Sequence, residues 1–240
     1  MTSQHTTLLD GRVQLMQSRD GLRASMDSVL LASAVKAKSG EIILDMGCGT
    51  GSVGLCVHAR IPNLILNGID IQEKMIALAN QNAALNKLSN ANYRCADVAD
   101  KSNYRAESFD GVVMNPPYYK DGERQPSPDE TRERAYSGDL NVWIASALHW
   151  VKQGGALTLI HRADALGEVL SLMNKKFGAI EIWPIHSKGN EPAIRVIVKG
   201  IRNRKSPLTI HPAIVLFNSN GEQSEQSKSI LQGGGDVSQA

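Results

Sequence analysis

The chain has 240 residues, of which 21% are charged, and a net charge of +2. This length suits one domain with a single core, and so small a net charge says little by itself about nucleic acid. No apolar run is long enough to span a membrane, and the first ten residues lack a secretory signal, so a cytoplasmic protein is expected. The three cysteines and six histidines have no metal-ligand spacing, which predicts free thiols and no bound metal.

The first predicted elements lie before and around a glycine-rich segment. Residues 12–17 and 22–24 flank a Ser-Arg-Asp-Gly turn and are predicted to form a small hairpin. A continuous apolar run over residues 41–46 predicts a buried strand, and residues 53–60 predict the helix that follows. The turn between them is therefore a strand-to-helix connection of the kind that binds nucleotide-like ligands.

The glycines of this turn indicate which ligand it suits. Gly47 and Gly49 permit close approach of the backbone, and Gly51 opens the helix where N–H groups are unpaired. The dinucleotide fingerprint G-x-G-x-x-G fits poorly, because Ser52 stands where its third glycine belongs. Asp45, at the end of the strand, can accept from the ammonium group of a methionine moiety or from amides of the turn.

Two further carboxylates follow predicted strands. The apolar run over residues 64–69 ends at Asp70, at the distance where an acidic residue binds ribose hydroxyls in this architecture. Apolar residues at helical spacing predict a helix over 72–85. A third strand over residues 91–95 is followed by Asp97, which is expected to accept from the amino group of an adenine or to act as a loop carboxylate.

A tetrapeptide after the apolar run 109–114 carries the predicted chemistry: Asn115, Pro116, Pro117 and Tyr118. The side-chain carbonyl of Asn115 and the main-chain carbonyl of Pro116 can each accept an N–H of a planar amino group, which frees its delocalised lone pair. The prolines restrict the backbone, and Tyr118 offers a flat face on which a base can stack. The alternative is an ordinary turn at the end of a strand.

The remaining elements complete an alternation of strands and helices. Helices are predicted over residues 140–151 and 163–177, and strands over 156–160, 179–185 and 193–199, the last two forming an antiparallel hairpin. Residues 1–217 are predicted to form a single domain. Residues 218–240 are rich in Ser, Gln, Gly and Asn and are expected to be a disordered polar tail.

Basic residues cluster in two places. One group, in the polar loop after the tetrapeptide, comprises Lys120, Arg124, Arg132 and Arg134; the other comprises Arg195, Lys199, Arg202, Arg204 and Lys205. Either group alone is typical of a solvated face. Both are expected to flank one mouth at the carboxyl ends of the strands and to contact RNA there.

Residues 27–217 resemble the class I S-adenosylmethionine-dependent methyltransferases, and within them the bacterial enzymes that methylate the adenine-N6 group beside the anticodon of valine tRNA. The general resemblance rests on Asp45-Met46-Gly47-Cys48-Gly49-Thr50-Gly51, on Asp70 and on the tetrapeptide. The narrower resemblance rests on residues 26–32, which precede the predicted strand over 41–46, on the pair Tyr118-Tyr119 before an arginine-containing loop, and on the basic run from Lys199. Met26 departs from the threonine that is usual in that family.

The resemblance implies a Rossmann-like α/β fold whose seven-stranded, mostly parallel sheet has one antiparallel strand and helices on both faces. It implies S-adenosylmethionine as cofactor and RNA, above all tRNA, as partner, with no metal. Cofactor contacts are expected at Asp45, Gly47, Cys48, Gly49, Gly51, Asp70, Ile71, Asp97, Val98 and Asn115. Catalysis is assigned to Asn115, Pro116, Pro117 and Tyr118, and substrate binding to Tyr118, Tyr119, Arg124, Arg132, Arg134, Arg202, Arg204 and Lys205.

Three other functions stay open. A methyltransferase acting on a protein glutamine also carries Asn-Pro-Pro-Tyr, although such enzymes usually have a helical domain in front. A guanine-N2 methyltransferase of ribosomal RNA usually has Phe at the last motif position. A non-catalytic RNA-binding module is opposed by the presence of Asp45, Asp70 and Asn115 together.

Overall fold

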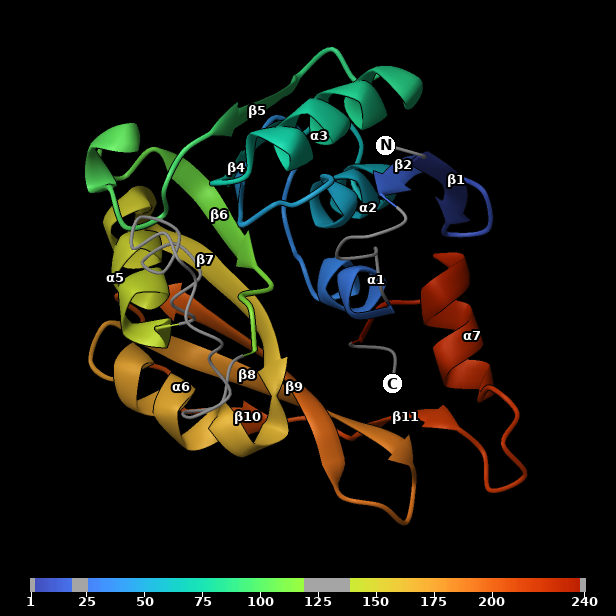
Figure 1. The fold of residues 1–240 in the computed structure, drawn as a ribbon. Helices are drawn as coiled ribbons and strands as arrows, with labels where there is room; N and C mark the ends of the chain where they lie inside the picture. Colours follow the sequence, from blue (N-terminus) through green and yellow to red (C-terminus); the bar gives the residue numbers. More distant parts are fainter. Residues whose placement is uncertain (1–2, 19–25, 119–138, 238–240) are drawn as a thin grey trace, which may run out of the picture.

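A computed structural model describes residues 3–18, 26–118 and 139–237. Its main sheet is formed by β3 Ile42–Met46, β4 Ile65–Asp70, β5 Ala91–Cys95, β6 Phe109–Met114, β7 Val151–Arg162, β8 Phe177–Lys188, β9 Ala193–Arg202, β10 Thr209–Ile210 and β11 Ile214–Phe217. The strand order is β10-β8-β9-β7-β6-β3-β4-β5, with β11 also paired to β8 (Figure 1). β3 therefore lies between β6 and β4, which brings the segments after these strands side by side.

The direction of the strands confirms the predicted fold. Strands β5, β4, β3, β6 and β7 run parallel to one another, whereas β9 runs antiparallel to both β7 and β8. These are the seven expected strands with one antiparallel member. The short strands β10 and β11, which were not predicted, extend the sheet by pairing parallel to β8.

The helices lie on both faces of the sheet: α1 Met26–Ser33, α2 Ser52–Arg60, α3 Glu73–Leu85, α5 Leu140–Trp150, α6 Leu166–Met173 and α7 Glu225–Gln232. Figure 1 shows α5 and α6 on one side and α1, α2 and α7 on the other. Side chains alternate between the faces along each strand. Ile43 and Val113 accordingly belong to the core under α1 and α2, whereas Leu44 and Val112 belong to the core under α5.

The N-terminal hairpin differs from its prediction. Its strands are β1 Ser3–Leu8 and β2 Val13–Ser18, and the turn lies at residues 9–12 instead of at the Ser-Arg-Asp-Gly segment. The turn forms at Asp10 and Gly11, which both adopt positive φ, of 54° and 84°. The expected second strand at residues 22–24 lies outside the described residues.

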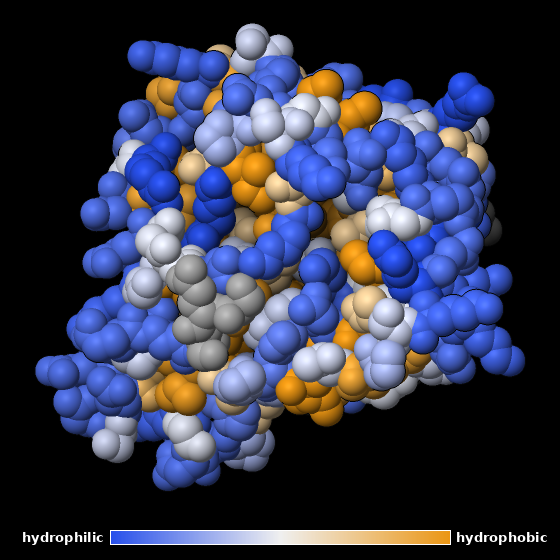
Figure 2. Space-filling view, turned by 180° about the vertical axis from the view of Figure 1, so that it is seen from behind, coloured by the Kyte–Doolittle hydropathy of each residue, from blue (hydrophilic) through white to orange (hydrophobic). Residues whose placement is uncertain are grey.

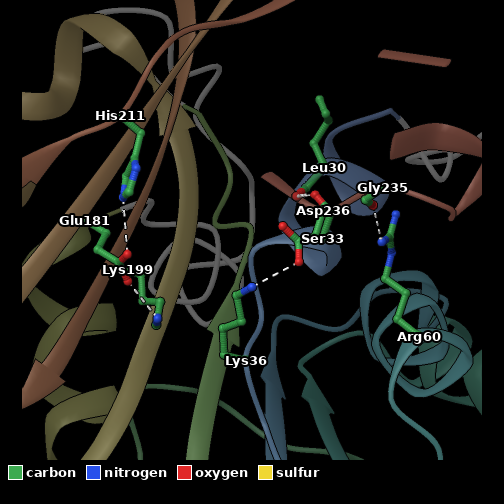
Figure 3. A network of polar contacts seen from close by, with 9 residues as sticks. All are labelled: Leu30, Ser33, Lys36, Arg60, Glu181, Lys199, His211, Gly235 and Asp236. Carbon is green, nitrogen blue, oxygen red and sulfur yellow. Dashed lines mark hydrogen bonds and ion pairs between the residues drawn. The ribbon is translucent and has the colours of Figure 1, made fainter. Parts of the chain in front are cut away.

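The C-terminal segment also differs from the expected disordered tail, because residues 225–232 form α7 and the structure is described as far as Val237. Ile230 and Val237 are 2% and 1% exposed in the core. Arg60 donates to the carbonyl of Gly235 at 2.7 Å, and Lys36 pairs with Asp236 at 3.0 Å (Figure 3). A few apolar residues within a polar composition are thus enough to dock this segment against α1 and α2.

Helix α6 is shorter than predicted. Residues 163–165 form a 3₁₀ turn, and α6 ends at Met173 instead of at residue 177. Lys175 adopts a left-handed φ of 61°, which an α-helix does not accommodate, and β8 begins two residues later.

Hydrophilic side chains cover most of the face drawn in Figure 2. The exposed large apolar side chains of the described chain come from β4, α3, β9 and the segment at β10, namely Ile65, Leu85, Ile194, Leu208 and Ile210. Apolar residues scattered in this way are ordinary for a protein surface and do not indicate a docking patch.

Candidate active site

The glycine turn after β3 is tied to the neighbouring strand β4. The N–H of Cys48 donates to the carbonyl of Ile69 at 2.9 Å, and the N–H of Gly49 donates to a carboxylate oxygen of Asp70 at 2.9 Å. The N–H of Gly51 closes the turn on the carbonyl of Cys48 at 2.8 Å. The loop is therefore fixed before any ligand arrives, as close approach to a cofactor requires.

The three glycines of the turn have different surroundings. All three have positive φ, but a Cβ on Gly47 would lie 2.4 Å from a ring carbon of Trp143, and one on Gly51 would lie 3.1 Å from Tyr93. A Cβ on Gly49 would meet nothing within 4 Å. Gly47 and Gly51 are thus packing positions, while Gly49 leaves an open cradle that a cofactor can fill.

Asp70 holds the backbone at Gly49 in place. One carboxylate oxygen accepts from Gly49, and the other accepts from the N–H of Gln72 at 2.9 Å, so both oxygens have a fixed position. The side chain is 9% exposed. Burial raises the pKa of Asp70, and the two backbone N–H bonds oppose that rise. Each oxygen has further lone pairs, which suits the acceptance of ribose hydroxyl protons.

Asp45 lies on the buried side of the turn and is 2% exposed. One of its oxygens accepts from the N–H of Gly54 in α2 at 3.0 Å. Burial raises the pKa of Asp45 to about 7; the Gly54 bond lowers it and the nearby Asp70 carboxylate raises it further. The carboxyl group is therefore poised to change charge when a cation binds beside it.

The raised pKa predicts a pH-dependent stability. The folded protein binds the Asp45 proton more tightly than the unfolded chain does. The contribution of this proton to the free energy of unfolding is therefore fully present below pH about 4 and is lost as the pH rises to about 7. We expect the free energy of unfolding of the wild type, minus that of Asp45→Asn, to fall by a few kcal/mol across this window, at about 1.36 kcal/mol for each unit of pKa difference. Denaturant titrations at several pH values measure this difference. A difference that does not vary with pH would contradict the assigned protonation.

The other expected cofactor residues surround the same edge of the sheet. Asp97 follows β5, is half-buried, and accepts from the N–H of Ala99 at 2.8 Å. Val98 is 8% exposed and packs in the core under α5, while Ile71 is half-buried after β4. Burial raises the pKa of the Cys48 thiol far above its usual range, so this cysteine is a packing residue without nucleophilic character.

The tetrapeptide begins directly after β6, with Pro116 buried and the other three residues half-buried. The hydroxyl of Tyr118 donates to the side-chain oxygen of Asn115 and lies 3.5 Å from a carboxylate oxygen of Asp27. The guanidinium of Arg195 lies 4.7 Å from the centre of the Tyr118 ring, over its face. A base that stacks on this tyrosine must therefore use the opposite face or replace Arg195.

Three residues of this site were not among the predicted site residues. Asp27, His161 and Arg195 contact Tyr118 from α1, β7 and β9, and Asp27 pairs with Arg195 at 3.3 Å. The His161 ring meets that of Tyr118 edge-to-face at 4.9 Å. Burial lowers the pKa of His161 to about 4, so the ring is neutral at physiological pH. Asp27 lay in the segment 26–32 that carried the narrower resemblance and Arg195 in the second basic group, whereas no sequence pattern marked His161.

The predicted substrate residues do not gather at one mouth. Arg202 donates to the carbonyl of Val151 and pairs with Glu107 at 3.0 Å. Val151 begins β7 and Glu107 lies two residues before β6, so Arg202 lies at the edge of the sheet opposite Asn115. Because β9 runs antiparallel, its basic residues extend from one edge of the sheet to the other. Lys199 lies midway and pairs with Glu181 at 2.7 Å (Figure 3).

The other predicted contacts to RNA divide into two sets. Exposed Arg204 and Lys205 follow Arg202 and so also lie away from Asn115, which corrects their assignment to the substrate mouth. Tyr119, Arg124, Arg132 and Arg134 lie outside the described residues.

Residues 3–18, 26–118 and 139–237 contain no group of three His, Cys, Asp or Glu side chains arranged to hold a metal ion. Over the same residues, no helix is long and apolar enough to cross a membrane.

The architecture and the site together define a class I methyltransferase: a parallel sheet with one antiparallel strand, a glycine turn after β3, and Asn115 after the adjacent β6. The chain belongs to the methyltransferase small domain family, whose model matches residues 22–188. Its cofactor is S-adenosylmethionine, and the open cradle at Gly49 with the carboxylates of Asp45 and Asp70 fits this molecule.

The sequence identity to individual proteins is modest. The chain is 26% identical over 182 residues to a tRNA1(Val) (adenine(37)-N6)-methyltransferase of Glaesserella parasuis serovar 5, covering 74% of this chain and 75% of that one. It is 31% identical over 151 residues to a release factor glutamine methyltransferase of Aliivibrio fischeri, covering 59% and 52%. A crystal structure of a predicted O-methyltransferase, Atu636 of Agrobacterium tumefaciens, has a TM-score of 0.74 at 24% identity, covering 88% and 98%, and shares the fold.

Proposed function

We propose that this protein transfers a methyl group from S-adenosylmethionine to the N6 amino group of an adenosine in RNA. Its natural target is an adenosine next to the anticodon of a tRNA. The observation that carries this proposal is the position of Asn115, directly after β6 and beside the turn of β3 that bears the open cradle. Two relatives named tRNA1(Val) (adenine(37)-N6)-methyltransferase match 74% and 77% of this chain, which favours adenine over other planar nitrogens.

The residues of the chain divide into two groups by role. Asp70 holds the Gly49 turn and is assigned the ribose hydroxyls, Asp97 the adenine amino group, and Asp45 the ammonium group of the cofactor. When bound, S-adenosylmethionine supplies an electrophilic methyl group.

On the substrate side, the Asn115 and Pro116 carbonyls accept the two N–H groups of the target, which localises the nitrogen lone pair towards the methyl group. Tyr118 supplies a stacking face for the extruded base. The ammonium group formed on an aromatic amine is strongly acidic, so water or the carbonyl pair takes up the released proton. No His or Cys is needed as a base.

The second candidate is methylation of a protein glutamine, favoured by the relative named release factor glutamine methyltransferase. Its side-chain amide is also a planar nitrogen that the Asn115 and Pro116 carbonyls can bind. The two candidates differ in their acceptor and not in their cofactor site.

Methyl transfer from labelled S-adenosylmethionine to separate pools of tRNA, ribosomal RNA, DNA and protein tests the proposal. We expect tRNA to be the best acceptor and the label to be recovered as N6-methyladenosine. Label in guanosine or in protein, with tRNA unmodified, would transfer the assignment to the guanine or the glutamine activity. No transfer to any pool would favour a non-catalytic module.

RNA affinity provides an independent prediction. Replacing Arg124, Arg132 and Arg134 with alanine is expected to weaken RNA binding and to lower the slope of log affinity against log salt by roughly 0.7 to 0.9 for each lost phosphate contact. The matched control is the pair Arg204→Ala and Lys205→Ala, whose exposed side chains lie at the edge of the sheet opposite Asn115. Filter binding at several salt concentrations measures both. An equal loss of slope in the control would show that binding is delocalised over the surface.

A further inference from the structure

The hydroxyl of Tyr118 lies between two acceptors. It donates to the side-chain oxygen of Asn115, and a carboxylate oxygen of Asp27 lies 3.5 Å away. A phenol carries a single proton, so a full hydrogen bond to one acceptor weakens any bond to the other. Burial first, and then the Asp27 carboxylate, raises the pKa of Tyr118, so the hydroxyl is a donor throughout the physiological range.

Asp27 is held in place from a distant part of the chain. It lies in the first turn of α1, and the Nε of Arg195, from the start of β9, pairs with it at 3.3 Å. The side chains of Asp27 and Arg195 are only 20% and 29% exposed. Arg195 also lies over the face of the Tyr118 ring and His161 lies against it edge-to-face, so the ring has contacts on several sides.

The bond from Tyr118 engages the atom on which the proposed chemistry depends. The side-chain oxygen of Asn115 must accept an N–H of the target amino group, and a hydroxyl already bonded there withdraws electron density and takes one of two lone-pair positions. A carboxylate is a stronger acceptor than an amide oxygen. A rotation of the hydroxyl towards Asp27 would therefore exchange the amide oxygen for a stronger acceptor and release Asn115.

We propose that Asp27 is a positioning residue that takes the Tyr118 hydroxyl away from Asn115 when the target base enters, with Arg195 holding the carboxylate in place. This inference rests on the proposed role of Asn115 as acceptor for the target nitrogen. Asp27 itself does not touch the substrate; it acts through Tyr118.

A double-mutant cycle tests this role. Asp27→Ala is expected to lower kcat about tenfold in the wild-type background, with the cofactor Kd unchanged, because the hydroxyl then stays on Asn115. In the Tyr118→Phe background no hydroxyl competes, and the same substitution should change kcat less than about twofold. Asp236→Asn, which breaks a surface pair with Lys36, is the matched control and should leave kcat unchanged in both backgrounds.

An equal loss of kcat in the two backgrounds would overturn the proposal, because Asp27 would then act only on the fold. If Asp27→Ala does not fold, Asp27→Asn keeps the shape and removes the charge, and the same comparison applies.

A spectroscopic measurement separates this inference from the proposed function. Of the five tyrosines labelled with 3-fluorotyrosine, the ¹⁹F resonance of Tyr118 is assigned by its loss in Tyr118→Phe. Asp27→Ala or Asp27→Asn is expected to shift this resonance, and Asp236→Asn is not. The measurement needs no acceptor, so it stands even if no RNA pool is methylated. A Tyr118 resonance that does not respond to either Asp27 substitution would overturn the inference, whatever molecule the protein methylates.

Discussion

Replacing Asn115 with alanine is expected to lower kcat by about a hundredfold or more, since removing one preorganised polar group from a transition-state site commonly has an effect of this size. The side-chain oxygen of Asn115 acts on the target nitrogen while its charge develops, so the loss belongs to the chemical step. Cofactor affinity should change little. Single-turnover methyl transfer measures the rate, and titration calorimetry measures the Kd of the cofactor.

Substitutions of Tyr118 provide the control for this result. Tyr118→Phe keeps the ring with its contacts to Arg195 and His161 and should retain most of the turnover, whereas Tyr118→Ala removes the stacking face and should lose the turnover. A single-turnover rate of Asn115→Ala close to that of the wild type would exclude the mechanism proposed for the tetrapeptide.

Replacing Asp70 with alanine is expected to weaken S-adenosylmethionine binding at least tenfold, which corresponds to about 1.4 kcal/mol. The substitution removes the proposed acceptor for the ribose hydroxyls and also the carboxylate that fixes the N–H groups of Gly49 and Gln72. Both effects act on the bound cofactor. Calorimetry on the purified variants measures the change in Kd.

Two variants separate these effects. Asp70→Asn keeps one oxygen that can accept from Gly49, so an intermediate affinity is expected. Asp110→Ala removes a carboxylate that likewise accepts a backbone N–H, from Ile42 at 2.9 Å, but at the opposite edge of the sheet. It should lower stability and leave cofactor affinity unchanged. Cofactor binding that is indifferent to Asp70 would refute the assigned pocket.

Much of the fold and of the candidate site follows from local sequence patterns. The apolar run before Gly47, the one before Asp70 and the one before Asn115 each predict a parallel strand, and all three strands are present. Because the carboxyl ends of parallel strands share one edge, residues that follow them must converge there, however far apart they lie in the sequence. The spacing of each motif from its own strand was therefore sufficient to place these residues.

Other predictions failed where the outcome depended on contacts that are distant in sequence. The C-terminal segment has a disordered composition, yet Ile230 and Val237 are buried against a surface built by α1 and α2. The basic residues of β9 looked like one group because they are close in sequence. The antiparallel direction of that strand leaves Arg195 beside Tyr118 and carries Arg202 to the other edge.

The sequence by itself thus determined the class of fold, the glycine turn after β3 and the position of Asn115, since each depends on a strand and the few residues that follow it. Only the tertiary structure decided what surrounds Tyr118. Asp27, His161 and Arg195 come from three elements that are far apart in the chain, and each is an ordinary residue in its own segment. Their meeting depends on the strand order and on the packing of α1 against the sheet, which no local spacing records.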